Sequence, residues 1–378
     1  MAEKREKRSG RKLRCGFTTG SAAAAGAKAG TIFLLTGAGP ERMDIPLPPG
    51  GRLSAPIHGY EPGPDSVTVS VVKDAGDDPD VTHGHVIQAM VELVSGDGPD
   101  QVEIVGGKGV GVVTLPGLPV PVGEPAINPE PRRQIREAVL EGCAQGGYSG
   151  RVRATISIPK GEELAQRTMN PRLGIVGGLS VLGVRGTVKP FSHEAYMAAI
   201  SEGLDVARAA GLKTAALSTG GRSERMLKQL RPELRPLCFI QIADFMASSL
   251  EAAAKRGFER IILGCFFGKL VKLGQGLRYT HADSGRIDFP GLAGVCARAG
   301  VSAAICAAVS TANTARQTLA AIEPDPAGKA GLELIGNKGL AKAREWTGPG
   351  PDLELFLFDF DGRVLLELSS PGSREKQK

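Results

Sequence analysis

Strand-like and helix-like segments alternate regularly from Ser192 onward, and this rhythm restricts the fold more than any other feature of the sequence. The predicted elements are a helix at 194–210, a strand at 214–218, a helix ending at Leu230, a strand at 238–242, a helix at 247–256 and a strand at 260–263. Such alternation favours a mostly parallel, Rossmann-like sheet with helices on both faces. Helices then predominate up to Trp346, and a C-terminal hairpin is predicted around Asp361-Gly362.

The first half of the chain has a different pattern, in which strands outnumber helices. An alanine-rich helix is predicted at 22–35, with Gly37 as its end. The other predicted elements are strands at 67–71, 86–94 and 151–158 and a helix at 131–142. The segment 40–64 is rich in Pro and Gly, so it is expected to be irregular or to lie at a sheet edge.

The prediction for the whole chain is therefore an α/β protein with two domains. The predicted parts are a disordered basic tail at 1–14, an α+β domain at 15–185, an α/β domain at 186–370 and a disordered tail at 371–378. The formal net charge of +6 resides in the two tails, and the remainder is close to neutral. Since aromatic residues make up only 4% of the chain, base stacking is disfavoured and nucleic acid is not the expected partner.

The six cysteines indicate a reducing compartment. They show neither a CxxC pair nor the spacing of a metal finger. No apolar run reaches the roughly 18 residues that a membrane span needs, and no signal-peptide pattern follows the basic N-terminus. The expected location is the cytoplasm, with no membrane partner.

Two polar segments of the first half could carry chemistry. Thr18, Thr19 and Ser21 precede the alanine-rich helix and could bind an anion at its positive end, although a plain helix cap is the commoner role of such residues. The segment from Lys73 to His85 holds four aspartates and two histidines, which could bind a hard cation or accept a proton. A stiffened turn explains the second segment equally well.

Glycine-rich and strand-end loops give a further set of candidates. The segment 170–186 lacks the order of a dinucleotide or phosphate loop, but its backbone could lie against a flat ligand or cross between domains. In the second half, 218–224, Asp244 and 264–272 each follow a predicted strand. Because ligands bind at the carboxyl ends of parallel strands, these loops form the strongest physical indication of a pocket.

Five separated segments in one order resemble the CbiD family, the cobalt-precorrin-5B C(1)-methyltransferases. These segments are Cys15–Ser21, Lys73–Gly84, Gly123–Pro129 with Pro131–Arg133, Asn170–Gly186, and Gly268–Leu273 with Thr280-His281. The resemblance implies transfer of a methyl group from S-adenosylmethionine to C-1 of a cobalt tetrapyrrole in anaerobic cobalamin synthesis. Cobalt then enters only as part of the substrate, and no metal cofactor is expected. Ala22 stands where many family members have Cys, so a catalytic thiol is not expected there.

The chemistry implied by the resemblance assigns candidate roles to residues. The sulfonium methyl is already activated and the electron-rich ring is the nucleophile, so the protein chiefly aligns the two and removes a proton. The candidate proton acceptors are Asp74, Asp77, His83, Asp244 and His281. The candidate cofactor-binding residues are Thr219, Gly220, Gly221, Asp244, Gly264 and Gly268. The candidate substrate-binding residues are Thr18, Thr19, Ser21, Arg172, Gly177, Gly178, Arg222, Arg225, Lys269 and Lys272.

Three other functions stay open on the sequence alone. A metal-dependent hydrolase would use the 74–85 loop, a non-catalytic carrier would bind the tetrapyrrole without the cofactor, and a nucleic-acid binder would use the basic tail. A homodimer is the base-rate expectation, and transient contact with neighbouring enzymes of the pathway is a further one.

Overall fold

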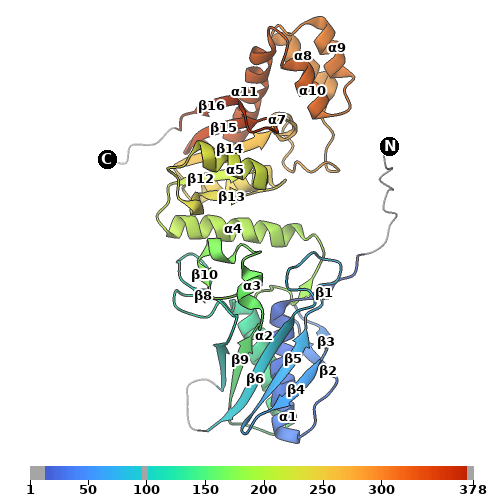
Figure 1. The fold of residues 1–378 in the computed structure, drawn as a ribbon, viewed down its shortest axis with the longest axis vertical. Helices are drawn as coiled ribbons and strands as arrows, with labels where there is room; N and C mark the ends of the chain where they lie inside the picture. The colour runs from blue at the N-terminus through green and yellow to red at the C-terminus, as the bar shows by residue number, and fades with distance from the viewer. Residues whose placement is uncertain (1–12, 96–100, 373–378) are drawn as a thin grey trace. The chain divides into compact units, whose positions relative to one another are not determined.

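The structure is a computed structural model that describes residues 13–95 and 101–372. The chain divides into two compact units between His193 and Glu194 (Figure 1). The predicted disordered tails lie outside the described residues except at their inner ends. Arg14, at the inner end of the first, pairs with Asp74 and is part of the folded unit.

A five-stranded sheet organises the first unit (Figure 1). Its strands, in spatial order, are β4 (Gly59–Pro62), β5 (Ser66–Val72), β6 (Val86–Val94), β9 (Arg151–Ser157) and β7 (Val102–Gly106). All neighbours are antiparallel except β7 and β9. The α+β prediction for this half is confirmed, and β6 has the predicted bounds.

Helix α1 (Thr19–Thr36) packs on the sheet because its side chains are small. On β5 the alternating residues Val67, Val69 and Val71 are fully buried against it. A Cβ atom on Gly30 of the helix would lie 2.6 Å from a methyl carbon of Val91 on β6, so the helix and strand approach as closely as glycine allows. The second helix on this face is α2 (Pro129–Gln145), which packs along α1.

The segment 40–64 is more regular than the sequence indicated. It forms the hairpin of β2 (Arg42–Pro46) and β3 (Arg52–Pro56) and then β4, which is an edge strand as expected. The Pro and Gly residues that suggest irregular or edge-like chain include the Pro-Gly-Gly turn that closes this hairpin. The shorter elements of this unit are β1 (Gly16–Phe17), β8 (Val112–Val113), α3 (Gly161–Ala165), η1 (Asn170–Leu173), β10 (Ile175–Val176) and β11 (Thr187–Val188).

The second unit contains the predicted parallel sheet. Its strands, in spatial order, are β13 (Phe239–Gln241), β12 (Thr214–Ser218), β14 (Arg260–Phe266), β15 (Asp352–Phe358) and β16 (Val364–Ser370). The first four are parallel, and β16 closes the predicted hairpin. Alternate residues of β15 enter two separate cores, with Leu355 in one and Phe356 in the other, so apolar layers cover both faces.

Eight helices lie in the described part of this unit and at its boundary. They are α4 (His193–Ala209), α5 (Gly221–Leu230), α6 (Met246–Lys255), α7 (Phe267–Gly274), α8 (Phe289–Arg298), α9 (Ala303–Ser310), α10 (Ala315–Ile322) and α11 (Gly328–Thr347). A short 3₁₀ turn, η2 (Pro236–Cys238), precedes β13. None of the helices in the described ranges has the length and apolarity that a membrane crossing requires.

One predicted loop is wrong in its secondary structure. The strand expected at 260–263 continues to Phe266, where it pairs with Phe358, and α7 begins at the next residue. The apolar residues Cys265 and Phe266 extend the strand past a glycine that had been interpreted as its end. The whole of the segment 264–272 is therefore strand and helix.

A tight turn against the N-terminal segment offers a test of the first unit's packing. Gly76 has a φ of +68°, and a Cβ atom there would lie 2.1 Å from the carbonyl oxygen of Arg14. We expect Gly76→Ala to lower the free energy of unfolding by at least ~2 kcal/mol, because left-handed strain adds to a backbone clash. Far-UV circular dichroism during urea unfolding measures the change.

Gly84→Ala in the same loop is the matched control for this substitution. Gly84 has a φ of +73°, but no heavy atom lies within 4 Å of its Cβ position, so only the conformational cost of about 1 kcal/mol is expected. Fluorescence of Trp346, the sole tryptophan, reports the second unit and should be unchanged in both variants. Equal losses in the two variants would contradict the packing argument.

Candidate functional site

Three segments that are far apart in the sequence meet at the N-terminus of α1. The backbone nitrogen of Phe17 donates to the carbonyl of Asp74 (2.8 Å), and that of Thr18 donates to the carbonyl of Gly186 (3.0 Å). The Asp78 carboxylate accepts from the backbone nitrogen of Phe191 (2.9 Å). The first unit therefore joins the 15–21, 73–85 and 170–191 segments into one assembly.

The hydroxyls at the start of α1 serve the fold. Thr18 is the N-cap, and its side chain accepts a hydrogen bond from the backbone nitrogen of Ser21. The Ser21 hydroxyl donates to the carbonyl of Gly186 (2.7 Å), and a Cβ atom on Gly183 would lie 2.6 Å from the side chain of Thr18. Thr18, Thr19 and Ser21 are all buried, so the positive end of this helix is closed by protein atoms. Helix capping, the simpler interpretation, accounts for these contacts.

The aspartates of the 73–85 loop are engaged in bonds within the protein. Asp74 pairs with the Arg14 guanidinium, whose hydrogen bonds lower the pKa of Asp74. The Asp77 carboxylate accepts from the backbone nitrogen of Arg14 (2.8 Å). Lys73, which is only 2% exposed, holds Asp80 in an ion pair. His83 is half exposed, and its Nδ1 atom accepts from the backbone nitrogen of Ala75 (3.0 Å).

These contacts disfavour a metal site in the loop. Cation ligands need carboxylate oxygens that converge on one point, whereas these oxygens point to different donors of the protein. Across residues 13–95 and 101–372 there is no group of three or more His, Cys, Asp or Glu side chains placed to hold a metal ion. The 73–85 loop instead binds the N-terminal segment through the bonds of Asp74 and Asp77 to Arg14.

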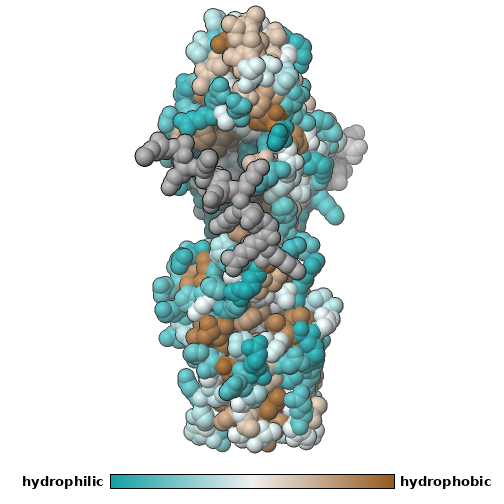
Figure 2. All heavy atoms as spheres, turned by 90° about the vertical axis from the view of Figure 1, so that its right-hand side faces the viewer, coloured by the Kyte–Doolittle hydropathy of each residue, from teal (hydrophilic) through white to brown (hydrophobic). Residues whose placement is uncertain are grey.

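The glycine-rich loop of the first unit combines a packed part with an open part. Gly178 packs against the backbone of Gly109, whereas no heavy atom lies within 4 Å of the Cβ position of Gly177. Burial lowers the pKa of Arg172 in the preceding 3₁₀ turn. Around this loop several large apolar side chains are exposed, and apolar patches are visible on the unit in Figure 2. They include Val176 (58%), Leu182 (48%) and Val184 (73%).

An ion pair forms where β13 ends in the second unit. The Asp244 carboxylate pairs with Lys269 on α7 and accepts a hydrogen bond from the Thr280 hydroxyl (3.2 Å). The ammonium of Lys269 also donates to the carbonyl of Thr280 (3.2 Å). Burial, and to a smaller extent the charge of Lys272, lower the pKa of Lys269 to about 8. Predicted site residues separated in sequence are thus in contact here.

Lys272 positions the loop that carries His281. Lys272 is only 8% exposed, and its ammonium donates to the carbonyls of Thr280 (3.1 Å) and His281 (2.7 Å). Burial lowers the pKa of Lys272. The imidazole of His281 is half exposed and lies 3.8 Å from the carboxylate of Asp283. Lys272 was predicted to bind a substrate carboxylate, but its donors are directed at backbone carbonyls.

Most of the remaining predicted residues of this unit lie at the carboxyl edge of the sheet, and Gly264 is an exception. The loop after β12 contains Thr219 and Gly220, and no heavy atom lies within 4 Å of the Cβ position of Gly220. The edge between β12 and β14 is where the strand order reverses direction. Gly264 lies inside β14 beneath Leu227, whereas Gly268, on the first turn of α7, lies close to Ala315 of α10.

Two residues at this edge were missed in the sequence. Phe360, which follows β15, is 50% exposed and stacks on Phe266. Arg222 of α5, which was predicted, and Arg316 of α10, which was not, both place their guanidinium groups over the Phe360 ring. No motif marked Phe360 or Arg316, because the first belongs to an ordinary hairpin turn and the second to an exposed helix.

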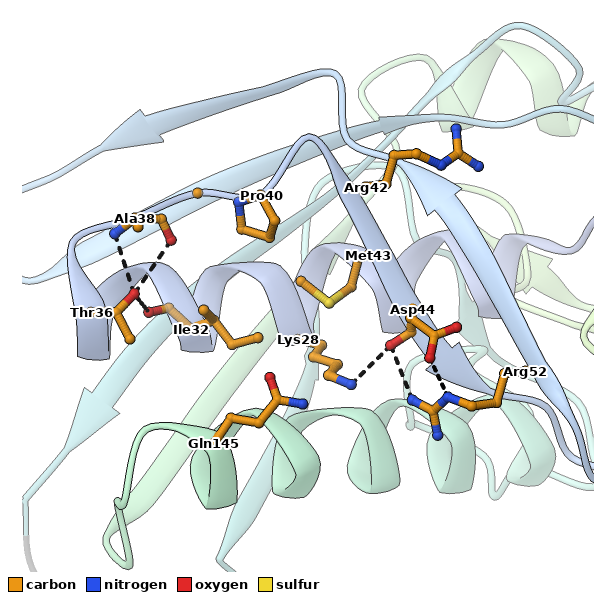
Figure 3. Close-up of a pocket in the computed structure, with 11 residues that line it drawn as sticks. Lys28, Ile32, Thr36, Ala38, Pro40, Arg42, Met43, Asp44, Arg52 and Gln145 are labelled. Atoms are coloured by element: carbon orange, nitrogen blue, oxygen red, sulfur yellow. Dashed lines mark hydrogen bonds and ion pairs between the residues drawn. The ribbon is translucent and has the colours of Figure 1, made fainter.

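A separate groove of about 490 Å³ lies in the first unit between α1 and the β2–β3 hairpin (Figure 3). None of the predicted site residues lines it. Two of its three cations form ion pairs within the protein: Lys28 donates to the Asp44 carbonyl (2.8 Å) and pairs with Glu141, and Arg52 pairs with Asp44. The third, Arg42, donates to the carbonyl of Ser54 (2.7 Å). The groove therefore reflects a structural ion-pair network.

Comparison with known proteins identifies the family. The family model described as CbiD matches residues 6–190, and the model described as CbiD, C-terminal domain, matches residues 279–368. A relative from Nitratidesulfovibrio vulgaris named cobalt-precorrin-5B C(1)-methyltransferase is 49% identical, over 93% of this chain and 92% of its own length. A relative of the same name from Thermus thermophilus is 45% identical, over 93% of each chain.

A crystal structure is also similar to this chain. It is described as a cobalamin biosynthesis protein (cbiD) from Archaeoglobus fulgidus and is 28% identical, with a TM-score of 0.38 over 69% of this chain and 79% of that one. The resemblance read from the five sequence segments is confirmed by the family models and by the near full-length relatives. The chain belongs to the CbiD family.

Proposed function

We propose that this chain transfers the methyl group of S-adenosylmethionine to C-1 of cobalt-precorrin-5B, giving cobalt-precorrin-6A in anaerobic cobalamin synthesis. The observation that carries the proposal is 49% identity to a relative of that name along nearly the whole of both chains. No nucleophilic side chain is needed, because the macrocycle supplies the electron pair that forms the new carbon–carbon bond while the sulfur leaves with the other pair.

The cofactor is proposed to bind at the carboxyl edge of the second unit's sheet. Ligands of open parallel sheets bind where the strand order reverses, which here lies between β12 and β14. Thr219, Gly220 and Gly221 turn at this point, and the open space beside Gly220 lets a ligand approach the backbone. Gly268 lies at the facing end of α7. Gly264 is left out of this proposal because Leu227 covers it.

The proton released from the methylated ring is proposed to pass to Lys269. Its neutral amine would accept the proton, and the Asp244 carboxylate would stabilise the ammonium that forms. A general base works best when its pKa is close to the operating pH, and burial brings the pKa of Lys269 to about 8. The contacts of Asp74, Asp77 and His83 with Arg14 and the backbone support structural roles for them instead.

The decisive experiment is an anaerobic incubation with cobalt-precorrin-5B and S-adenosylmethionine that carries a labelled methyl group. Mass analysis of the tetrapyrrole should show one labelled methyl, and carbon NMR should place it at C-1. A ring that binds without being methylated, together with no affinity for S-adenosylmethionine, would replace the proposal by the carrier function.

Gly220→Val tests the cofactor position. Because nothing lies near the Cβ position, we expect unchanged stability, but the added side chain would occupy the space proposed for the cofactor. Isothermal titration should show S-adenosylmethionine binding weakened at least ~10-fold, which corresponds to about 1.4 kcal/mol.

The matched control is Gly350→Val, at a glycine that also has no heavy atom near its Cβ position. Gly350 precedes β15, so it lies at the opposite, amino edge of the sheet. Cofactor affinity should be normal in this variant. If both variants bind the cofactor normally, the cofactor lies elsewhere.

A further inference from the structure

The aromatic pair at the carboxyl edge of the second unit is held by a built turn. Phe266 ends β14, Phe360 follows β15, and their rings stack with centroids 4.8 Å apart and planes 10° apart. The Asp359 carboxylate accepts hydrogen bonds from the backbone nitrogens of Asp361 (2.9 Å) and Arg363 (2.8 Å). These hydrogen bonds hold the turn that contains Phe360, so the half-exposed ring of Phe360 has a defined position.

Two guanidinium groups from different helices flank this ring. The guanidinium carbons of Arg222 and Arg316 lie 5.7 and 5.6 Å from the centroid of Phe360. Arg222 and Arg316 are the second residues of α5 and α10. The positive dipole end of each helix therefore adds to the positive charge of its arginine. The contact of Gly268 with Ala315 joins the start of α10 to that of α7. Three helix N-termini therefore surround the aromatic pair.

The charge at this place is not balanced by the protein. Within the part of the chain that the structure describes, no carboxylate forms an ion pair with Arg222 or Arg316. Arg363 on the same turn shows the contrast, because it is paired with both Asp359 and Glu323. Two unneutralised cations beside one ring repel each other, and an anionic ligand would relieve that repulsion.

We infer that Phe360, Arg222 and Arg316 form a docking platform for the flat, carboxylate-bearing face of the tetrapyrrole substrate. The inference rests on the proposed function and names the part of the substrate that this edge holds. The Phe360 ring, which already stacks on Phe266, supports two planar guanidinium groups. Guanidinium groups stack on planar ligands and bind carboxylates in a forked geometry, so they suit a flat macrocycle that carries carboxylates. The two guanidinium groups favour the polyanionic substrate at the ring itself, and the cofactor proposed at the neighbouring Gly220 turn would then lie beside the substrate, as methyl transfer requires.

The test determines the KM for each of the two substrates separately, in steady-state methyl transfer under anaerobic conditions. The double variant Arg222→Met, Arg316→Met should raise the KM for cobalt-precorrin-5B roughly 10-fold or more per arginine, while the KM for S-adenosylmethionine stays unchanged. Phe360→Ser should raise the same KM without changing its dependence on salt. The matched control is Arg235→Met, Arg298→Met, which removes the same charge from exposed positions of the second unit.

A non-reactive probe separates this inference from the proposed function. Uroporphyrin is a flat tetrapyrrole with eight carboxylates, and its octamethyl ester lacks the charge. The wild-type protein should bind the acid and not the ester, and the arginine double variant should lose that preference. An unchanged KM and unchanged uroporphyrin binding in the double variant would overturn the platform while methyl transfer by the wild type stands. Arginine-dependent uroporphyrin binding by a wild type that transfers no methyl would support the platform and refute the proposed function.

Discussion

Asp244→Asn is expected to slow methyl transfer by about 100-fold, within the range that positioned proton transfer contributes. The substitution removes the charge that stabilises the ammonium of Lys269, and it weakens the bond that Thr280 donates to the same carboxylate. Single-turnover rates, measured anaerobically with both substrates saturating, report the chemical step. The control is Asp283→Asn, because that carboxylate is 93% exposed and should leave the rate near the wild-type value.

The pH dependence of the methyl-transfer rate tests the same role of Lys269. If neutral Lys269 accepts the proton, the wild-type rate rises with pH and levels off above about pH 8. In Asp244→Asn the ammonium loses its counter-ion while burial remains, so the pKa of Lys269 falls and the rise moves to lower pH. In Lys269→Met the rise should vanish. A wild-type profile that is flat between pH 6 and 10, or one that Lys269→Met leaves in place, would remove Lys269 from the mechanism.

Local pattern was sufficient to predict most of the fold. The strand at 214–218 and the strand at 86–94 have the predicted bounds, because each is a short apolar segment between clear breaks. Prediction failed at the end of β14, where Gly264 was interpreted as a stop. In the structure this glycine makes room for Leu227, and such a long-range packing reason leaves no local signal.

The candidate site was predictable in place but not in detail. Topology alone brings the loops after β12, β13 and β14 to one edge, so their residues could be grouped from sequence. The bonding partners of the two lysines could not be predicted. Lys269 pairs with Asp244, which is distant in sequence, and Lys272 donates to the carbonyls of Thr280 and His281. Both lysines looked like free cations in the sequence. Arg316 became a candidate only because the structure places its guanidinium group beside the ring of Phe360.

The buried cation of the first unit leads to an asymmetric stability prediction. Lys28 is 2% exposed, and its ammonium pairs with Glu141 (2.6 Å). Glu141→Gln leaves that cation buried without its counter-ion, so we expect a loss of about 3 kcal/mol. Lys28→Met should lie within about 1 kcal/mol of the wild type, because Met fills the space and Glu141 keeps its bonds to Arg52.

The pH dependence distinguishes this ion pair from simple packing. Hydrogen bonds from Arg52 first, and then from Lys28, outweigh burial and lower the pKa of Glu141 to about 2. Because the folded pKa lies below the unfolded value, the carboxylate stabilises the fold above about pH 4.5, and that stabilisation is lost as the pH falls towards 2. Urea unfolding followed by circular dichroism should therefore show the Glu141→Gln deficit at pH 7 and a smaller one at pH 3. A deficit of equal size at both values, or an equal loss in Lys28→Met, would mean that side-chain packing around α1 stabilises this unit and the charge pair does not.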